Sequence, residues 1–149
     1  MRPVAHTLIE SVQVPMAQLF AFLASPGRMP DWLPDCTRVE YEAPLKRGAK
    51  FTARFGERVS EFEVVDYAPP ATFGWAERSG RRGSKIFFRL DGNSGLTALT
   101  IREVWTPRSL LAWLVGHVRQ RREVTRPLKN VAERVRNMET ACGLPAKKL

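Results

Sequence analysis

The segment at residues 97–106, TALTIREVWT, places a carboxylate within an apolar alternation. Successive side chains on a β-strand point to opposite faces, so one face of this segment carries Leu99, Ile101, Glu103 and Trp105. Three of these four side chains are apolar, and Glu103 is the exception. A carboxyl group inside an apolar cavity could act as a general acid or base, or bind a ligand hydroxyl or amine. Glu103 is therefore the candidate catalytic residue.

A second interpretation of Glu103 stays open. A twist or bulge near the end of the strand would let the carboxylate reach water, where it could pair with an arginine of the following segment. Ionisable side chains are seldom buried without a partner. Arg54 and Arg102 alternate with apolar neighbours, so we expect both to face solvent.

The candidate ligand-binding residues are mainly aromatic and lie on segments expected to face a common interior. Aromatic rings also dominate ordinary cores, so a purely structural role stays open for each ring. Tyr67 would add a hydroxyl group, or lie on the surface beside Pro69 and Pro70. Together the rings favour a pocket for a planar or lipid-like ligand. The predicted set is Trp32, Phe51, Phe55, Tyr67, Trp75, Phe88, Leu99, Ile101, Trp105, Thr125 and Leu128.

Motifs for other kinds of chemistry are missing from the sequence. His6 and His117 fall on different predicted elements, and Cys36 and Cys142 lack metal-ligand spacing, so we predict no metal site. The chain contains no GxGxxG, P-loop or GxSxG motif, and we predict no cofactor. Both cysteines are expected to be buried free thiols.

Alternation and helical spacing predict the elements that would position these residues. Residues 4–14 alternate as a strand, and residues 15–25 carry an apolar helical stripe that begins at a proline and stops at Pro26. The segment RMPDWLPD predicts one short helical turn or a loop. Six short strands joined by turn signals follow, up to residue 106, and predict an antiparallel meander.

The remaining segment, from about residue 109 to 141, has the period of one long helix with a kink near Pro127. The predicted fold class is thus α+β: a seven-stranded antiparallel sheet wrapped around a long C-terminal helix, with two short helices after the first strand. A twisted sheet around a single helix leaves a space between them, which is often a ligand pocket.

Composition and length fit one soluble domain covering residues 1–149. The chain is 44% apolar and 26% charged, as in ordinary globular proteins. The longest apolar stretch, SLLAWLVG, is far shorter than a membrane span, and the N-terminal residues lack a signal-peptide core. We therefore expect a cytoplasmic protein.

The formal net charge of +9 is carried by the second half of the chain. Residues 1–75 hold 8 basic and 9 acidic side chains, whereas residues 76–149 hold 16 and 6. The basic run HVRQRREVTRPLKNVAERVR could dock an anionic membrane surface, or it could be an ordinary solvated helix face. Nucleic acid is a disfavoured partner because the basic residues are not interleaved with aromatics. A homodimer stays open.

The order of elements resembles the helix-grip fold of the START/Bet v 1-like (SRPBCC) superfamily, and specifically its polyketide cyclase/dehydrase-type branch. The segments that carry the resemblance are VPMAQLFAFLASPGRMPDWLP, LKRGAKF, VVDYAPPATFGW, GLTALTIREVW and LKNVAERV. They span essentially the whole chain, and they specify the fold better than the function. Members of the superfamily include cyclases, aromatases, lipid and quinone carriers, hormone receptors and proteins with no known ligand.

The resemblance implies a cavity between the sheet and the long helix that takes an apolar small molecule. The first hypothesis is binding or transport of a lipid, isoprenoid, quinone or aromatic polyketide. The alternative is a polyketide cyclase/dehydratase-type enzyme in which Glu103 moves protons. A further alternative is an interaction module that uses the basic helix on an anionic membrane or on nucleic acid.

Overall fold

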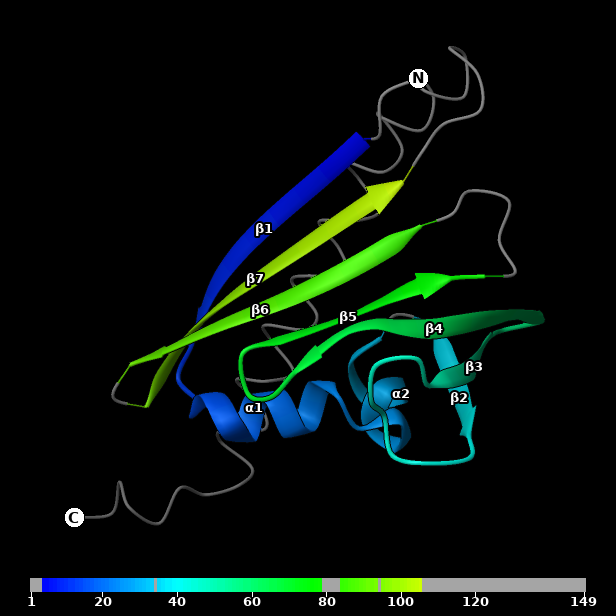
Figure 1. The fold of residues 1–149 in the computed structure, drawn as a ribbon, viewed down its shortest axis with the longest axis horizontal. Coiled ribbons are helices and arrows are strands. Elements are labelled where there is room, and N and C mark those ends of the chain that lie inside the picture. The colour runs from blue at the N-terminus through cyan, green and yellow to red at the C-terminus, as the bar shows by residue number, and fades with distance from the viewer. Residues whose placement is uncertain (1–3, 34, 79–83, 94, 106–149) are drawn as a thin grey trace.

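The structure, a computed structural model, describes residues 4–33, 35–78, 84–93 and 95–105 (Figure 1). Three short helices follow the first strand: α1 (Met16–Leu23), the 3-10 helix η1 (Pro26–Arg28) and α2 (Met29–Trp32). No helix in this described part is long and apolar enough to cross a membrane. The strands are β1 (Val4–Val12), β2 (Cys36–Tyr41), β3 (Lys50–Phe55), β4 (Arg58–Ala68), β5 (Thr72–Glu77), β6 (Lys85–Asn93) and β7 (Leu96–Trp105).

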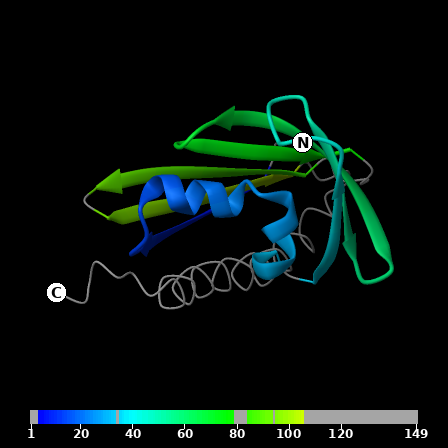
Figure 2. The same ribbon diagram turned by 90° about the horizontal axis from the view of Figure 1, so that it is seen from below.

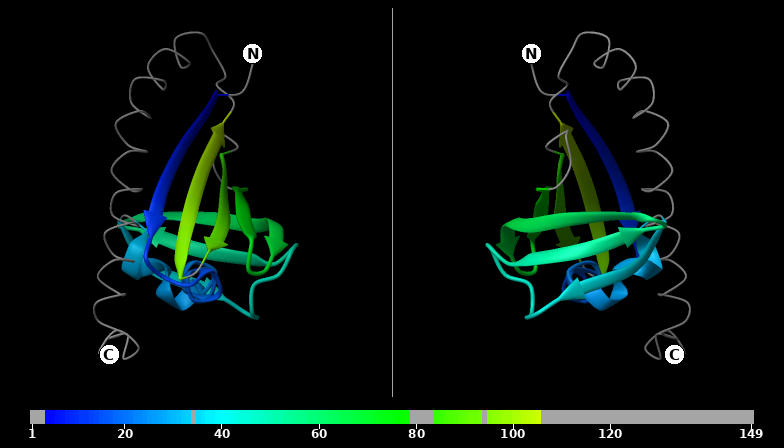
Figure 3. Two further views of the ribbon diagram at one scale, coloured as in Figure 1. Left: turned by 90° about the vertical axis from the view of Figure 1, so that its left-hand side faces the viewer. Right: turned by 90° about the vertical axis from the view of Figure 1, so that its right-hand side faces the viewer.

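The seven strands form one antiparallel sheet in the order β1-β7-β6-β5-β4-β3-β2. The predicted meander from β2 to β7 is confirmed, and β1 joins it beside β7. The sheet is strongly bent: β1 and β7 run steeply where β3 and β4 run across (Figure 3). The predicted long C-terminal helix lies outside the described residues.

Helices α1 and α2 lie on one side of the sheet, which we call its inner face (Figure 2). Helix α1 contacts β6 and β7, and α2 contacts the edge strand β2. The apolar stripe predicted for α1 is buried, with Leu19 and Leu23 almost fully covered. A protein helix gains most of its stability by burying such a stripe, so α1 is held by the sheet.

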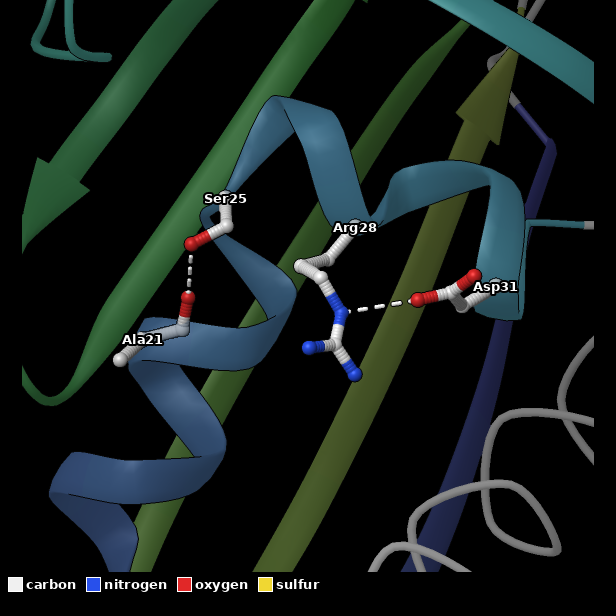
Figure 4. Close-up of polar contacts among 4 residues, drawn as sticks. All are labelled: Ala21, Ser25, Arg28 and Asp31. Carbon is white, nitrogen blue, oxygen red and sulfur yellow. Dashed lines mark hydrogen bonds and ion pairs between the residues drawn. The ribbon is translucent and has the colours of Figure 1, made fainter.

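Local polar contacts fix the bend between α1 and α2 (Figure 4). The Ser25 hydroxyl donates to the carbonyl of Ala21 at the end of α1, and Arg28 forms an ion pair of 2.8 Å with Asp31. Exposed ion pairs contribute little stability, so this pair mainly orients the turn. The bend carries Trp32 back under the sheet, where its side chain is buried. The one-turn helix predicted around this tryptophan is confirmed as α2.

A bulge in β4 changes which side chains reach the inner face. Strict alternation after Phe62 and Val64 would send Tyr67 to the outer face. The register shifts between Val64 and Asp66, and Tyr67 then lies directly opposite Phe73. The extra residue rotates the end of the strand by one position, so Tyr67 is partly buried and in ring contact with the inner-face residue Phe73.

The outer face holds a close contact between two strands. Gly74 on β5 lies directly opposite Phe87 on β6, and both are at least partly buried. A Cβ atom at Gly74 would lie 2.7 Å from Cδ1 of the Phe87 ring and 2.9 Å from the carbonyl oxygen of Ile86. The phenyl ring therefore occupies the space that any larger residue at position 74 would need.

Candidate functional site

The inner face carries a continuous group of rings, which we call the aromatic cluster. Strands β3 to β6 supply most of it because Phe51 lies opposite Phe62 and Phe73 lies opposite Phe88 across the sheet. Stacked and edge-on ring contacts of this kind add stability beyond the area they bury. The members of the cluster are Phe20, Trp32, Phe51, Phe55, Phe62, Tyr67, Phe73, Trp75 and Phe88.

Trp75 joins the two halves of the aromatic cluster. Its ring centroid lies 5.3 Å from that of Phe88 and 5.4 Å from that of Phe73. On its other side it lies 5.7 Å from Phe51 and 6.1 Å from Phe62. The cluster is thus one connected and largely buried group of rings.

Trp32 enters the aromatic cluster from α2. Its ring meets Phe88 edge-on at 5.6 Å and lies 6.1 Å from the ring of Trp75. Only 2% of the residue is exposed. The indole nitrogen Nε1 is buried and has no hydrogen-bond partner among the described residues.

A groove of about 770 Å³ reaches the aromatic cluster at the β2–β3 end of the sheet. Phe51 and Phe62, stacked at 5.2 Å, form part of its lining. The connection between β2 and β3 borders the groove and is tied to β4 by two backbone hydrogen bonds of 2.8 Å. The charged residues around the groove are Glu40, Glu42, Lys46, Lys50, Glu61 and Arg78.

Arg78 is held in place at this groove. Its backbone N–H donates to the carbonyl of Glu61 at 2.8 Å, and its guanidinium lies 2.6 Å from the carboxylate of Glu63. The groove therefore combines an apolar lining with fixed polar groups, as small-molecule sites commonly do.

Glu103 lies on the inner face, as its alternation with apolar residues predicts. It follows the buried residues Leu99 and Ile101 on the same face of β7, and its side chain is partly buried. Its position is directly opposite Ile86 on β6 and His6 on β1. A carboxylate here can meet a ligand that lies against this end of the sheet, and its role as acid or base stays a prediction.

The other predicted site residues divide by where the structure places them. Phe55 and Tyr67 are partly buried against the core, and Arg54 and Arg102 are exposed as predicted. Trp105 is the last residue of β7, and its side chain is not described. Thr125, Leu128 and the basic run lie outside the described residues. The fully buried members of the predicted ligand-binding set are Trp32, Phe51, Trp75, Phe88, Leu99 and Ile101.

Three rings of the aromatic cluster, Phe20, Phe62 and Phe73, were not among the predicted site residues. Phe73 is two positions before Trp75 on the same strand, so alternation alone could have placed it on the same face. The place of Phe62 in the cluster follows from its pairing with Phe51. That pairing depends on the length of the β3–β4 turn. That turn contains Gly56 at a φ of 63°, a conformation that favours glycine.

Cys36 is a buried free thiol, as predicted, and Cys142 lies outside the described residues. Burial raises the pKa of the Cys36 thiol above its ordinary value, and a hydrogen bond with the Arg38 backbone acts against this only in part. The thiol is therefore protonated at neutral pH and is a poor nucleophile. Within the described ranges, no three His, Cys, Asp or Glu side chains gather as a metal site would require.

A family model described as polyketide cyclase/dehydrase and lipid transport matches residues 6–136. The protein belongs to this family. Membership in the polyketide cyclase/dehydrase and lipid transport family agrees with the resemblance seen in the sequence. The matched region includes Glu103 and every predicted ligand-binding residue. No curated protein matches the sequence.

Solved structures with the same fold resemble this family member over most of its length. The di-domain ARO/CYC StfQ from the steffimycin biosynthetic pathway aligns with a TM-score of 0.77 and 12% identity, over 95% of this chain and 52% of StfQ. Protein MLL2253 from Mesorhizobium loti aligns with a TM-score of 0.70 and 13% identity, over 89% of this chain and 96% of MLL2253. The Aha1 dimer from Colwellia psychrerythraea aligns with a TM-score of 0.64 and 15% identity, over 91% of this chain and 97% of the Aha1 chain. At these identities the similarity establishes the fold and leaves the ligand open.

Proposed function

We propose that this protein binds a hydrophobic small molecule on the inner face of its sheet, in a cavity between the sheet and the C-terminal helix that the sequence predicts. The candidate ligands are a lipid, an isoprenoid, a quinone or an aromatic polyketide. The observation that carries the proposal is the groove at Phe51 and Phe62, which joins an apolar lining to a charged rim. Its volume lies in the range of known small-molecule sites, about 300–1,000 Å³. The family description, which includes both polyketide chemistry and lipid transport, supports the same class of ligand.

The proposal predicts that a ligand of this class raises the melting temperature. A ligand present at 100 times its dissociation constant stabilises a folded protein by about 2.7 kcal/mol. For a chain of this size that corresponds to a rise of roughly 5–10 °C. The measurement is a thermal-shift screen of phospholipids, isoprenoids, quinones and aromatic polyketides, with native mass spectrometry to confirm one bound molecule.

Two substitutions locate the binding that this screen detects. Phe51→Ala opens the lining of the groove and should reduce the ligand-induced shift, measured against the melting temperature of that variant alone. Val59→Ala, at an exposed position, should leave the shift unchanged. If no member of the screen forms a complex or raises the melting temperature, the proposed function is wrong.

A second candidate function, a cyclase or dehydratase, is favoured by the position of Glu103 beside buried apolar residues. Under the binding role, Glu103→Gln should change affinity by only a few-fold. Under the catalytic role, the same change should leave binding intact and reduce turnover by about 10²–10⁴-fold, the usual contribution of a positioned acid or base. The assay compares binding and turnover of an aromatic polyketide analogue, with Arg102→Gln on the exposed face as the matched control.

A further inference from the structure

The indole N–H of Trp32 is the feature that the proposed function does not yet use. Trp32 is 98% buried, and its Nε1 has no hydrogen-bond partner within residues 4–33, 35–78, 84–93 and 95–105. Buried polar groups are almost always hydrogen-bonded, and one that lacks a partner loses its contacts with water without replacement. A tryptophan at this position therefore needs a reason beyond filling space, since a phenylalanine would fill much of it.

The described ring neighbours of Trp32 are apolar and offer its N–H no hydrogen-bond acceptor. Its ring neighbours are Phe88 and Trp75, and neither offers a hydrogen-bond acceptor to it. Trp75 in turn contacts Phe51 and Phe62, which line the groove. Trp32 itself does not line the groove, so its N–H is linked to the proposed ligand site through Trp75 and the two groove rings.

We propose that the Trp32 indole N–H donates a hydrogen bond to a neutral carbonyl oxygen of the bound ligand. This inference rests on the proposed function and narrows its ligand class to ketone- or quinone-bearing ring systems and away from hydrocarbon isoprenoids. Indole is a donor only, so it selects an acceptor. A carboxylate is a poorer choice, because burying an ion among neutral rings without a counter-charge is unfavourable.

Selectivity for the carbonyl follows from the burial of the donor. A site that hydrogen-bonds a ligand oxygen discriminates against an analogue without that oxygen, because the analogue leaves the buried N–H unpaired. Trp32 is thus a specificity-determining residue, and its effect should appear as a difference between two ligands of the same shape.

The test uses 9-fluorenone and fluorene, two tricyclic molecules of nearly equal shape that differ by a carbonyl in place of a methylene. Isothermal titration measures both dissociation constants for the wild-type protein, for Trp32→Phe and for the control Val59→Ala, at an exposed position outside the groove. We expect the wild type to bind fluorenone about tenfold more tightly, which corresponds to about 1.4 kcal/mol. Trp32→Phe should lose this preference while keeping its affinity for fluorene, and Val59→Ala should keep the preference.

A second measurement requires no substitution. With ¹⁵N-labelled tryptophan, the Trp32 indole proton resonance should move downfield on adding fluorenone and much less on adding fluorene. Equal binding of both probes, or an indole resonance that responds equally to both, overturns the carbonyl inference and leaves the proposed function standing. Failure of both probes to bind counts against the proposed site itself, and the inference falls with it.

Discussion

Replacing Phe73 with alanine is expected to lower the free energy of unfolding by about 3–5 kcal/mol. The Phe73 residue is fully buried, and its ring is stacked on Phe88 at 6.0 Å. It also contacts Phe20 of α1 and Tyr67 of β4, so it joins the helix to the sheet. Removal of the ring would take away these contacts and leave a cavity that the paired strands cannot collapse to fill.

Urea denaturation followed by tryptophan fluorescence measures this loss. Ile9→Ala is the control, because Ile9 is 66% exposed on β1 and its truncation should change stability by no more than about 0.5 kcal/mol. Phe73→Leu tests the size dependence and should fall between the two. A loss below about 1 kcal/mol for Phe73→Ala would contradict the packing described for the inner face.

The second large effect is expected for Gly74→Ala, which should lower the free energy of unfolding by about 1–3 kcal/mol. Alanine in place of glycine usually stabilises a chain slightly, because it restricts the unfolded state. Here the added methyl group would lie 2.9 Å from the carbonyl oxygen of Ile86, a backbone atom on the paired strand. The strands would have to separate, or the Phe87 ring would have to leave its place, and either change removes contacts.

Gly27→Ala is the matched control, because the nearest atom to its new methyl group is the Tyr41 hydroxyl oxygen at an ordinary 3.8 Å. Its stability should stay within about 0.5 kcal/mol of the wild type. A double-mutant cycle with Phe87→Ala separates the two contacts at position 74. The part of the loss that disappears in the Phe87→Ala background belongs to the ring, and the remainder belongs to the backbone of β6. A stabilising Gly74→Ala would refute the close approach of β5 and β6.

Alternation and turn signals were enough to predict the seven strands, the short helices and the antiparallel meander. These features depend on near neighbours in the chain: proline at the start of α1, glycine at the tight turns, and apolar residues two positions apart. The same reasoning placed Glu103 on the face of Leu99 and Ile101, because no register shift intervenes in β7 between these residues.

The parts of the site that escaped prediction depend on contacts between distant segments. Which ring meets Phe51 is decided by cross-strand register, so Phe62 was missed. The position of Tyr67 depends on one extra residue in β4, which no local pattern announces. The Trp32 N–H, which has no partner in the described part of the chain, results from the packing of α2 against β5 and β6, and residue types alone do not reveal it.

The bulge at Val65 also bears on how this chain can vary in length. Before the bulge, even-numbered positions such as Phe62 face inward, and after it Tyr67 does, so the two halves of β4 already differ in phase. A single-residue deletion or insertion elsewhere in the strand would turn one half inside out. At the bulge, a deletion of Val65 would remove the irregularity and leave Tyr67 opposite Phe73, and an insertion would only enlarge it. Homologues that differ by one residue in this strand should therefore carry the difference here, and sequence alignments of the family should place their gap between positions 64 and 66.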